Sequence, residues 1–212
     1  MIGVDLNQNA SWEIRAAIDG FTPRGPVAAT SDGRYTVWSA SKAVGGGESE
    51  YALGVRDTTS GAVSVFAVPA LEQLIAHPRR LQVYALTRST VITIDPSGLR
   101  EVGGCETQQD ASLTMDGSQL FILCTEGRVI VLDTPTTSIV REVVLPDPVE
   151  TIQVSADGQR VAAAYPRTNL QDGGWVFMML SPGIAWHSFR HRLSPPFLSR
   201  PSSDGSASAA RF

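Results

Sequence analysis

The sequence is poor in cysteine, histidine and charge. Of its 212 residues, two are cysteine and three are histidine, and charged residues make up 18%, below the roughly 25% of an average soluble domain. Two cysteines are too few for a disulfide framework, and their spacing is not that of a zinc site. The formal net charge of −4 does not suit a protein that binds the phosphate backbone. We therefore expect no nucleic-acid partner.

Long apolar runs are also missing. No run reaches the roughly 18 residues of a membrane span. Residues 1–9 do not contain a basic segment followed by an apolar one, which a signal peptide requires. The sequence thus predicts no membrane association and a cytoplasmic protein. A rival interpretation is that Met1 is not the natural start and that an upstream signal is missing.

The two cysteines leave two states open. Cys124 falls at the end of an apolar stretch, where a buried free thiol is the default expectation. The alternative is a disulfide with Cys105, which requires the two Cα atoms to come within about 7 Å.

Known catalytic signatures are absent as well. The sequence has no Gly-x-Ser-x-Gly elbow and no glycine-rich loop followed by Lys and Ser or Thr. Residues 45–47 are three glycines without such a lysine, and we interpret them as a flexible loop. His187 and His191 are four residues apart but have no third partner, whereas a catalytic zinc normally has three protein ligands. We predict no catalytic residue, no cofactor and no metal site, and we interpret His77, which precedes a proline, as a turn residue.

What the sequence does contain is a repeat with two markers. Short apolar stretches end in an aspartate and are followed by a turn, at spacings of 52, 38 and 38 residues. These aspartates are Asp5, Asp57, Asp95 and Asp133. The second marker precedes a new apolar stretch, at Ser31-Asp32-Gly33, Met115-Asp116-Gly117 and Ala156-Asp157-Gly158. Self-similarity at about 40 to 45 residues is the signature of four-stranded propeller blades.

The repeats predict an all-β fold, a β-propeller of about four four-stranded blades that is incomplete or truncated. We expect a half-blade at 1–20 and full blades at about 26–68, 71–104, 110–145 and 149–186. The second of these blades is the least regular, because its first segment fits either a strand or one helical turn. Residues 187–212 are rich in Ser, Pro and Arg and are expected to form a disordered tail. An alternative is that this tail is foreign sequence from an altered reading frame.

Several conspicuous side chains have a structural interpretation. Asp32, Asp116 and Asp157 recur at the repeat spacing, so we expect them to cap turns rather than to form catalytic carboxylate pairs. Three tryptophans lie in apolar stretches and are expected to pack between blades, namely Trp12, Trp38 and Trp175. The alternative for Trp38 is that it reaches a rim or the central channel. Three arginines are interpreted as ordinary surface charges, namely Arg56, Arg88 and Arg128.

At these positions the chain resembles the WD-repeat and YVTN-type β-propellers over about residues 2–180. Their blades carry Ser-x-Asp-Gly before one strand and an aspartate followed by Thr or Ser and Gly after another. The matching segments here are Ser155–Val161, Ser31–Tyr35, Val55–Val63 and Val129–Thr134. No Trp-Asp pair ends a third strand, so the resemblance is closer to the YVTN type.

The resemblance implies a fold more than a function. We expect a non-catalytic scaffold that binds a protein or peptide, because no catalytic constellation accompanies the repeats. The first alternative is a propeller enzyme or cofactor binder of the lactonase or quinoprotein kind, which would need inward-facing His, Asp, Glu or Asn from successive blades. The second is a truncated fragment without independent function. Exposed blade faces of an open arc would also favour self-association.

Overall fold

The computed structural model describes residues 2–5, 10–13, 19–145, 149–164, 174–179 and 188–192, with side chains at 19–145 and 149–164. This part of the chain is almost entirely β-structure. It forms one two-stranded sheet and four four-stranded antiparallel sheets, each built from strands that are consecutive in sequence. The predicted all-β fold with four-stranded blades is confirmed. Within the described residues, no helix is long and apolar enough to cross a membrane.

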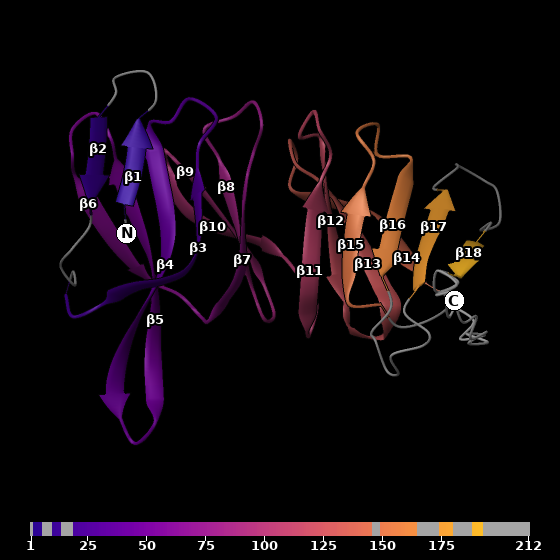
Figure 1. Ribbon diagram of the computed structural model, residues 1–212, viewed down its shortest axis with the longest axis horizontal. Coiled ribbons are helices and arrows are strands. Elements are labelled where there is room, and N and C mark those ends of the chain that lie inside the picture. The colour runs from indigo at the N-terminus through magenta and orange to yellow at the C-terminus, as the bar shows by residue number, and fades with distance from the viewer. Residues whose placement is uncertain are drawn as a thin grey trace, which may run out of the picture.

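The sheets stand side by side in a row (Figure 1). The two-stranded sheet, β1 (Ile2–Asp5) with β2 (Ala10–Glu13), lies near one end of the row, and the last sheet lies at the other. The first strands of successive four-stranded sheets contact one another, β3 with β7, β7 with β11 and β11 with β15. This is the arrangement of propeller blades, whose first strands line a common axis.

The first blade contains β3 (Thr22–Ala29), β4 (Tyr35–Gly45), β5 (Glu48–Asp57) and β6 (Val63–Ala67). The predicted flexible loop at residues 45–47 is wrong, because β4 and β5 pair until Gly45 lies opposite Glu48. Gly46 has a φ of +61° and Gly47 one of +85°, and such positive values are available to glycine at little cost and close the hairpin in two residues. The hairpin projects beyond the other strands (Figure 1).

The second blade is regular in structure although not in sequence. It contains β7 (Leu71–Ala76), β8 (Val83–Thr87), β9 (Val91–Asp95) and β10 (Gly98–Gly103). The segment that fitted either a strand or a helical turn is the strand β7, paired with β8 from Leu71 opposite Thr87 to Ala76 opposite Val83.

The third blade, predicted at about 110–145, contains β11 (Gln108–Leu113), β12 (Gln119–Cys124), β13 (Arg128–Asp133) and β14 (Ser138–Val144). A single 3₁₀ turn at Thr125–Gly127 joins β12 to β13.

The fourth blade begins in the same way, with β15 (Thr151–Val154), β16 (Arg160–Ala164) and β17 (Gly174–Met179). Its fourth strand, β18 (Ser188–Arg192), lies where the sequence predicted the start of a disordered tail. The rest of that tail, 193–212, lies outside the described residues.

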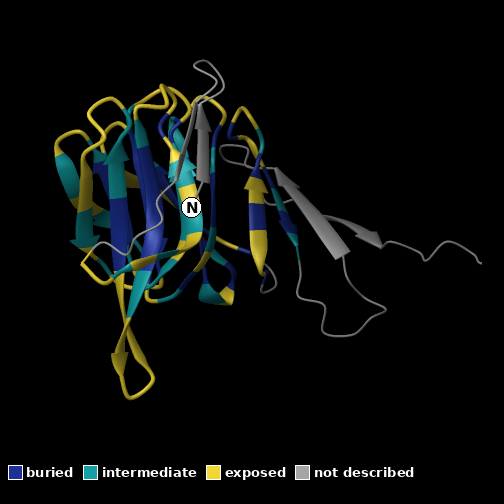
Figure 2. Ribbon diagram, turned by 60° about the vertical axis from the view of Figure 1, so that its left-hand side comes forward, coloured by how far each residue is buried: buried dark blue, intermediate teal, exposed yellow. Residues whose placement is uncertain are grey.

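Three hydrophobic clusters lie between successive blades, and they explain why the middle strands are buried on both faces. Figure 2 shows buried residues along the middle of the sheets and exposed residues on the turns and the projecting hairpin. Trp38 is 1% exposed and packs on the backbone of Gly54 opposite it, so it belongs to the core rather than to a rim. The clusters centre on Leu53 and Val83, on Leu86 and Leu120, and on Leu123 and Val161.

The cysteines form a disulfide, so the expectation of a free thiol is wrong. Cys105 lies in the connection between the second and third blades, and Cys124 ends β12, with the two Cα atoms 6.1 Å apart. Both residues are buried. The bond therefore fixes the connection between two blades to the second strand of the third blade.

Candidate ligand-binding face

The turns that join the first two strands of a blade share one design in the first, third and fourth blades. In the third blade, Thr114 N–H donates to Gln119 O at 3.0 Å, and Gly117 N–H donates to Thr114 O at 2.9 Å. Asp116 Oδ1 accepts Ser118 N–H at 2.9 Å, which closes the turn from the inside. The predicted capping role of these aspartates is confirmed in all three turns; the other two are Asp32, which accepts from Arg34 N–H, and Asp157, which accepts from Gln159 N–H.

The capping bonds also perturb the carboxyl groups. The Ser118 N–H, followed by the hydroxyl groups of Thr114 and Ser118, lowers the pKa of Asp116 from 3.8 to about 2. A carboxylate that accepts several N–H and O–H bonds favours its charged form. These aspartates are thus ionised turn elements.

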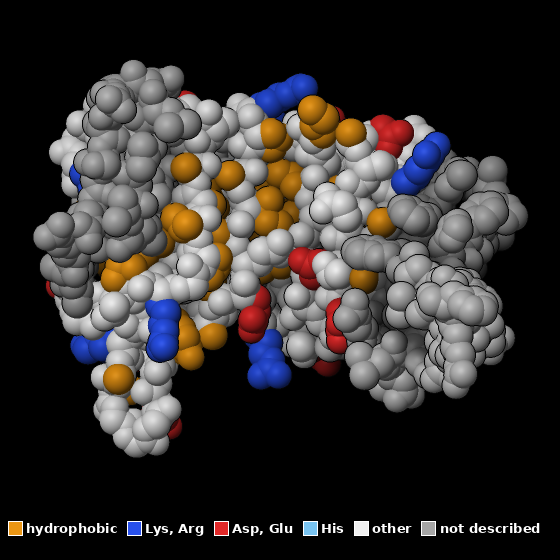
Figure 3. Space-filling model, in the orientation of Figure 1, with side chains coloured by type: hydrophobic (Ala, Val, Ile, Leu, Met, Phe, Trp, Pro, Cys, Tyr) orange, Lys and Arg blue, Asp and Glu red, His pale blue; other side chains and the backbone are white. Residues whose placement is uncertain are grey.

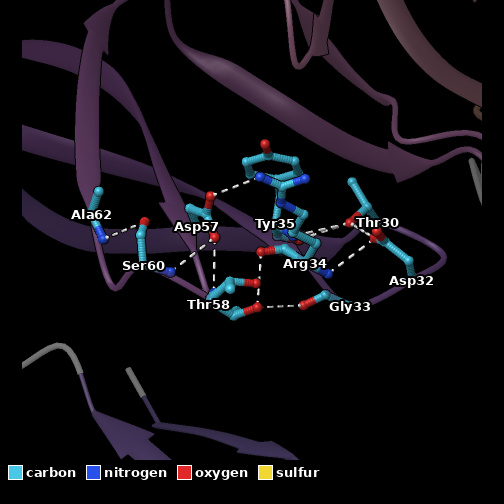
Figure 4. Close-up of polar contacts among 10 residues, drawn as sticks. Thr30, Asp32, Gly33, Arg34, Tyr35, Asp57, Thr58, Ser60 and Ala62 are labelled. Atoms are coloured by element: carbon cyan, nitrogen blue, oxygen red, sulfur yellow. Dashed lines mark hydrogen bonds and ion pairs between the residues drawn. The ribbon is translucent and has the colours of Figure 1, made fainter.

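In the first and third blades, the turn that joins the last two strands lies at the same end as the first turn and is tied to it. In the first blade, Thr58 donates its hydroxyl to Gly33 O at 3.0 Å and to Arg34 O at 2.9 Å (Figure 4). In the third blade, Thr134 Oγ1 donates to the Gly117 carbonyl, and Thr134 N–H donates to Ser118 O. A threonine directly after the aspartate therefore ties the two turns together. We call this end of the four-stranded sheets the turn face.

The second blade departs from this design in its first turn. His77 occupies the position of Thr114, since its N–H donates to Gln82 O at 2.9 Å across the same five-residue span. Its Nδ1 accepts the N–H groups of Arg79 and Arg80, both at 3.0 Å. A histidine side chain thus accepts the backbone N–H groups of this turn, whereas an aspartate side chain is the acceptor in the other first turns. His77 is the turn residue that the sequence predicted, and it is buried against Gly117 of the next blade.

Burial also sets the charge of this histidine. Burial lowers the pKa of His77 from 6.5, and the nearby Arg80 lowers it further. The neutral form is the one whose Nδ1 can accept two hydrogen bonds. Burial thus keeps the imidazole neutral, and the neutral imidazole accepts the N–H groups that hold the turn.

The second blade also lacks the bridging threonine. Pro96 stands directly after Asp95, and proline has neither an N–H nor a hydroxyl to donate. Asp95 Oδ1 instead accepts the Ser97 N–H at 2.8 Å within its own turn. Among the described residues, no hydrogen bond joins this turn to the His77 turn, and a groove opens between them. It is lined by Arg80, Gln82, Asp95, Ser97, Arg100 and Pro135, among others.

An apolar cavity of about 200 Å³ adjoins this groove, between the first and second blades. The cavity and the groove share Leu81, Asp95, Pro96 and Ser97, so they are two parts of one site. On the face drawn in Figure 3, hydrophobic side chains gather over the middle of the row of blades. The apolar lining of the cavity is formed by Tyr35, Val55, Phe66, Leu81, Ile94 and Leu99.

The charge of the second blade is inverted at this face. Arg79 and Arg80 stand where the other first turns carry Asp and Gly, and Arg100 lies on β10 beside the groove. All three are exposed, and none forms an ion pair with a described carboxylate. By contrast, Arg34 pairs with Asp57 at 3.4 Å in the first blade. The turn face thus carries a basic island in a chain that is acidic overall.

Polar side chains on the innermost strands join neighbouring blades. Gln73 of β7 exchanges two hydrogen bonds with the backbone of Ala111 on β11, at 3.0 and 3.2 Å. Asp110 Oδ2 accepts Ile152 N–H of β15 at 2.8 Å, and Ser112 Oγ makes a similar bond to the same strand. The carboxylate and amide groups at these positions are therefore engaged in holding blades together.

The other highlighted side chains divide between structural roles and positions outside the described part. Arg128 pairs with Glu142 at 3.1 Å on the surface, as expected of an ordinary charge. His187 lies outside the described residues, and only the backbone of His191 is described. Within the part of the chain that has side chains, no three His, Cys, Asp or Glu gather as metal ligands would.

Sequence reasoning missed the face that the structure singles out. The aspartate pattern drew attention to the regular blades, whereas the site lies on the irregular one. The available signal was the pair Arg79-Arg80 at a repeat position otherwise held by Asp and Gly, together with Pro96 where Thr58 and Thr134 stand.

The fold is shared with β-propellers of known structure. Hydrazine synthase from Kuenenia stuttgartiensis aligns with a TM-score of 0.58 and 16% identity, over 84% of this chain and 53% of that one. The β-propeller domain of the trilobed protease from Pyrococcus furiosus, described as having an open velcro topology, aligns with a TM-score of 0.58 and 10% identity, over 79% of this chain and 58% of that one. A chain of the mitotic checkpoint complex aligns with a TM-score of 0.57 and 11% identity, over 84% and 54%.

These likenesses place the chain in the β-propeller fold and, at such low identities, show the fold alone. The chain spans 53% to 58% of the length of these three structures. No protein-family model matches the chain, and no curated protein matches its sequence.

Proposed function

We propose that this chain is a non-catalytic propeller scaffold of the WD or YVTN type, which binds a protein or peptide segment on the turn face of its second blade. The observation that carries the proposal is the joined cavity and groove at Leu81, Asp95, Pro96 and Ser97. Among the three blades whose two turns are both described, it occurs in the one whose turns are not tied together.

The division of the site into two parts favours a peptide over a compact small molecule. Small-molecule sites usually enclose about 300 to 1,000 Å³ in one cavity, whereas here the open groove has about 440 Å³ and the apolar cavity about 200 Å³. The volume of the cavity suits one apolar side chain, and the adjoining groove suits the neighbouring backbone and polar groups. A side chain anchored in a pocket with a polar rim is the usual form of a peptide contact.

The disulfide bears on the compartment. Disulfides persist in oxidising environments and are rare in the cytosol, and Cys105 is bonded to Cys124 here. We infer that the scaffold works in an oxidising compartment, in place of the cytoplasm that the N-terminal sequence suggested. Thiol labelling of the protein from its native source tests this, since labelling of the unfolded protein without reductant would refute it.

The binding test is a selection of phage-displayed peptides on the purified chain, followed by measured affinities. Ser97→Trp places a bulky side chain at the shared edge of cavity and groove and should abolish binding of the selected peptides. Thr59→Trp is the matched control, because Thr59 N–H donates to Asp57 Oδ1 at 2.8 Å, as Ser97 N–H does to Asp95. Failure to select any peptide, or peptides indifferent to Ser97→Trp, would refute the proposal.

A further inference from the structure

The groove on the turn face presents arginines that form no ion pair with a described carboxylate. The guanidinium groups of Arg80 and Arg100 line the groove, where Asp95 is the one carboxylate among the lining residues. Asp95 Oδ1 is already engaged by the N–H and the hydroxyl of Ser97. Two exposed cations therefore share the groove with one carboxylate, so its lining carries a net positive charge.

The neighbouring blades do not cancel this charge through ion pairs. Asp116 lies near Arg79 and Asp133 lies near Arg80, as their lowered pKa values reflect, but capping bonds are the larger cause in both. Asp116 Oδ1 accepts from Ser118, and Asp133 Oδ2 accepts Thr136 N–H at 3.0 Å. Asp116 and Asp133 keep their negative charge in these capping bonds, but no guanidinium group of the basic island donates a hydrogen bond to a described residue, so the N–H donors remain available to a ligand.

The backbone that carries these arginines is held in place. His77 Nδ1 fixes the N–H groups of Arg79 and Arg80, and Ser31 Oγ of the first blade contacts the Arg80 carbonyl at 3.4 Å. The arginines thus project from a turn that is defined before any ligand arrives. A preorganised site loses less entropy on binding than a flexible one.

The apolar cavity and the basic groove select together for one kind of ligand. Because they share a rim, a bound segment can fill the cavity with one side chain while a neighbouring group reaches the arginines. Planar guanidinium groups match carboxylates in bidentate geometry. A nucleic acid fits less well, since the apolar cavity offers its phosphates no partner and its repeated charges would extend to Asp133 near Arg80, where a single carboxylate of a peptide need not reach.

We infer that the ligand of this face is an acidic peptide segment, with a large apolar side chain in the cavity between the first two blades and a Glu or Asp beside it bound by Arg80 and Arg100. This inference rests on the proposed function and names the chemistry of its partner. The inverted charge of the second blade is then a specificity element.

The test uses the best-bound peptide from the phage selection, synthesised with two analogues. One analogue replaces its Glu and Asp by Gln and Asn, and the other replaces its largest apolar residue by Ala. Each should bind at least about tenfold more weakly than the parent, which corresponds to about 1.4 kcal/mol. Affinity should also fall when NaCl is raised from about 0.05 to about 0.5 M, because exposed charges are screened.

Protein variants identify the groups responsible. The double variant Arg80→Gln, Arg100→Gln should reduce binding of the parent peptide by at least about tenfold and should leave the affinity of the Gln/Asn analogue unchanged. Arg141→Gln is the control, since Arg141 is an exposed arginine on β14 outside both hollows.

The possible outcomes distinguish a failure of this inference from a failure of the proposed function. If Ser97→Trp abolishes binding but neither the acidic residues nor the arginines matter, peptide binding stands and the acidic specificity is wrong. If a single-stranded oligonucleotide binds and loses affinity in the arginine variant while no peptide does, the partner class is wrong. Equal losses with Arg141→Gln would also overturn the inference, because the effect would then be one of net charge.

Discussion

Substitution of Gly54 by alanine tests the packing of the first blade directly. Gly54 on β5 is buried and lies opposite Trp38 on β4. A Cβ at this position would lie 2.1 Å from Trp38 Cε2 and 2.2 Å from Cζ2, well inside the distance that carbon atoms tolerate. Its φ is not in the positive range, so the restriction is steric rather than conformational.

The cost follows from how little either partner can move. Trp38 is 1% exposed, and its ring would have to shift by more than about 1 Å to reach ordinary contact, at which carbon atoms lie about 3.5 Å apart. Adding a methyl group to a well-packed core costs about 1 to 3 kcal/mol. We expect Gly54→Ala to lower the free energy of unfolding by about this amount, which for a domain of this size lowers Tm by about 2 to 4 °C per kcal/mol.

Urea unfolding monitored by circular dichroism measures the loss, and a double-mutant cycle identifies its cause. Trp38→Leu removes the ring atoms closest to the added Cβ, so Gly54→Ala should cost clearly less in that background than in the wild type. Ser49→Thr is the control, since it adds one methyl group at an exposed position of the same strand. A loss below about 0.5 kcal/mol, or additive single and double variants, would refute the steric argument.

Three further measurements address the turns and the disulfide. Because the pKa of His77 in the folded state lies below its ordinary value of 6.5, the stabilisation by the neutral imidazole is complete above pH 6.5 and is lost as the pH falls toward the folded pKa. The free energy of unfolding, measured with urea at several pH values, should fall over this range, and His77→Thr should abolish that fall. Reduction of the Cys105–Cys124 bond, which spans 19 residues, should lower the free energy of unfolding by about 3 kcal/mol. In the variant with both cysteines replaced by serine, reductant should leave the free energy of unfolding unchanged. Thr134→Val leaves the Gly117 carbonyl buried without its donor and should cost about 1 to 3 kcal/mol in chemical denaturation, more than Thr58→Val, whose partners are exposed.

The sequence allowed the blades to be located because their turns are chemically local. Asp116 is followed by Gly117 and caps its own turn, so both residues reveal the turn without reference to the rest of the fold. In the third blade, predicted at about 110–145, aspartates cap both turns of the turn face, and the strands run from Gln108 to Val144. Where local chemistry changed, at residues 45–47 and at β7, the prediction was wrong or undecided.

Contacts between blades could not be predicted in this way. The disulfide depends on a Cα distance of 6.1 Å between a connection and a strand end, and 19 residues of separation do not determine that distance. Likewise, Gln73 reveals nothing by itself of its two bonds to Ala111, 38 residues away. Such pairings depend on how the sheets stack, and a repeat spacing alone does not specify them.

The second blade shows why the candidate site lies where the repeat fails. The first and third blades each tie their two turns together with a threonine, which closes the turn face over that blade. Pro96 removes this tie, and His77 restores order to the first turn by a different route, with its ring packed against the next blade. The blade has therefore lost an internal bond, kept a rigid turn and gained an open groove. Departures from local rules that are compensated elsewhere tend to mark functional positions, and this departure brings two arginines to the edge of an apolar cavity.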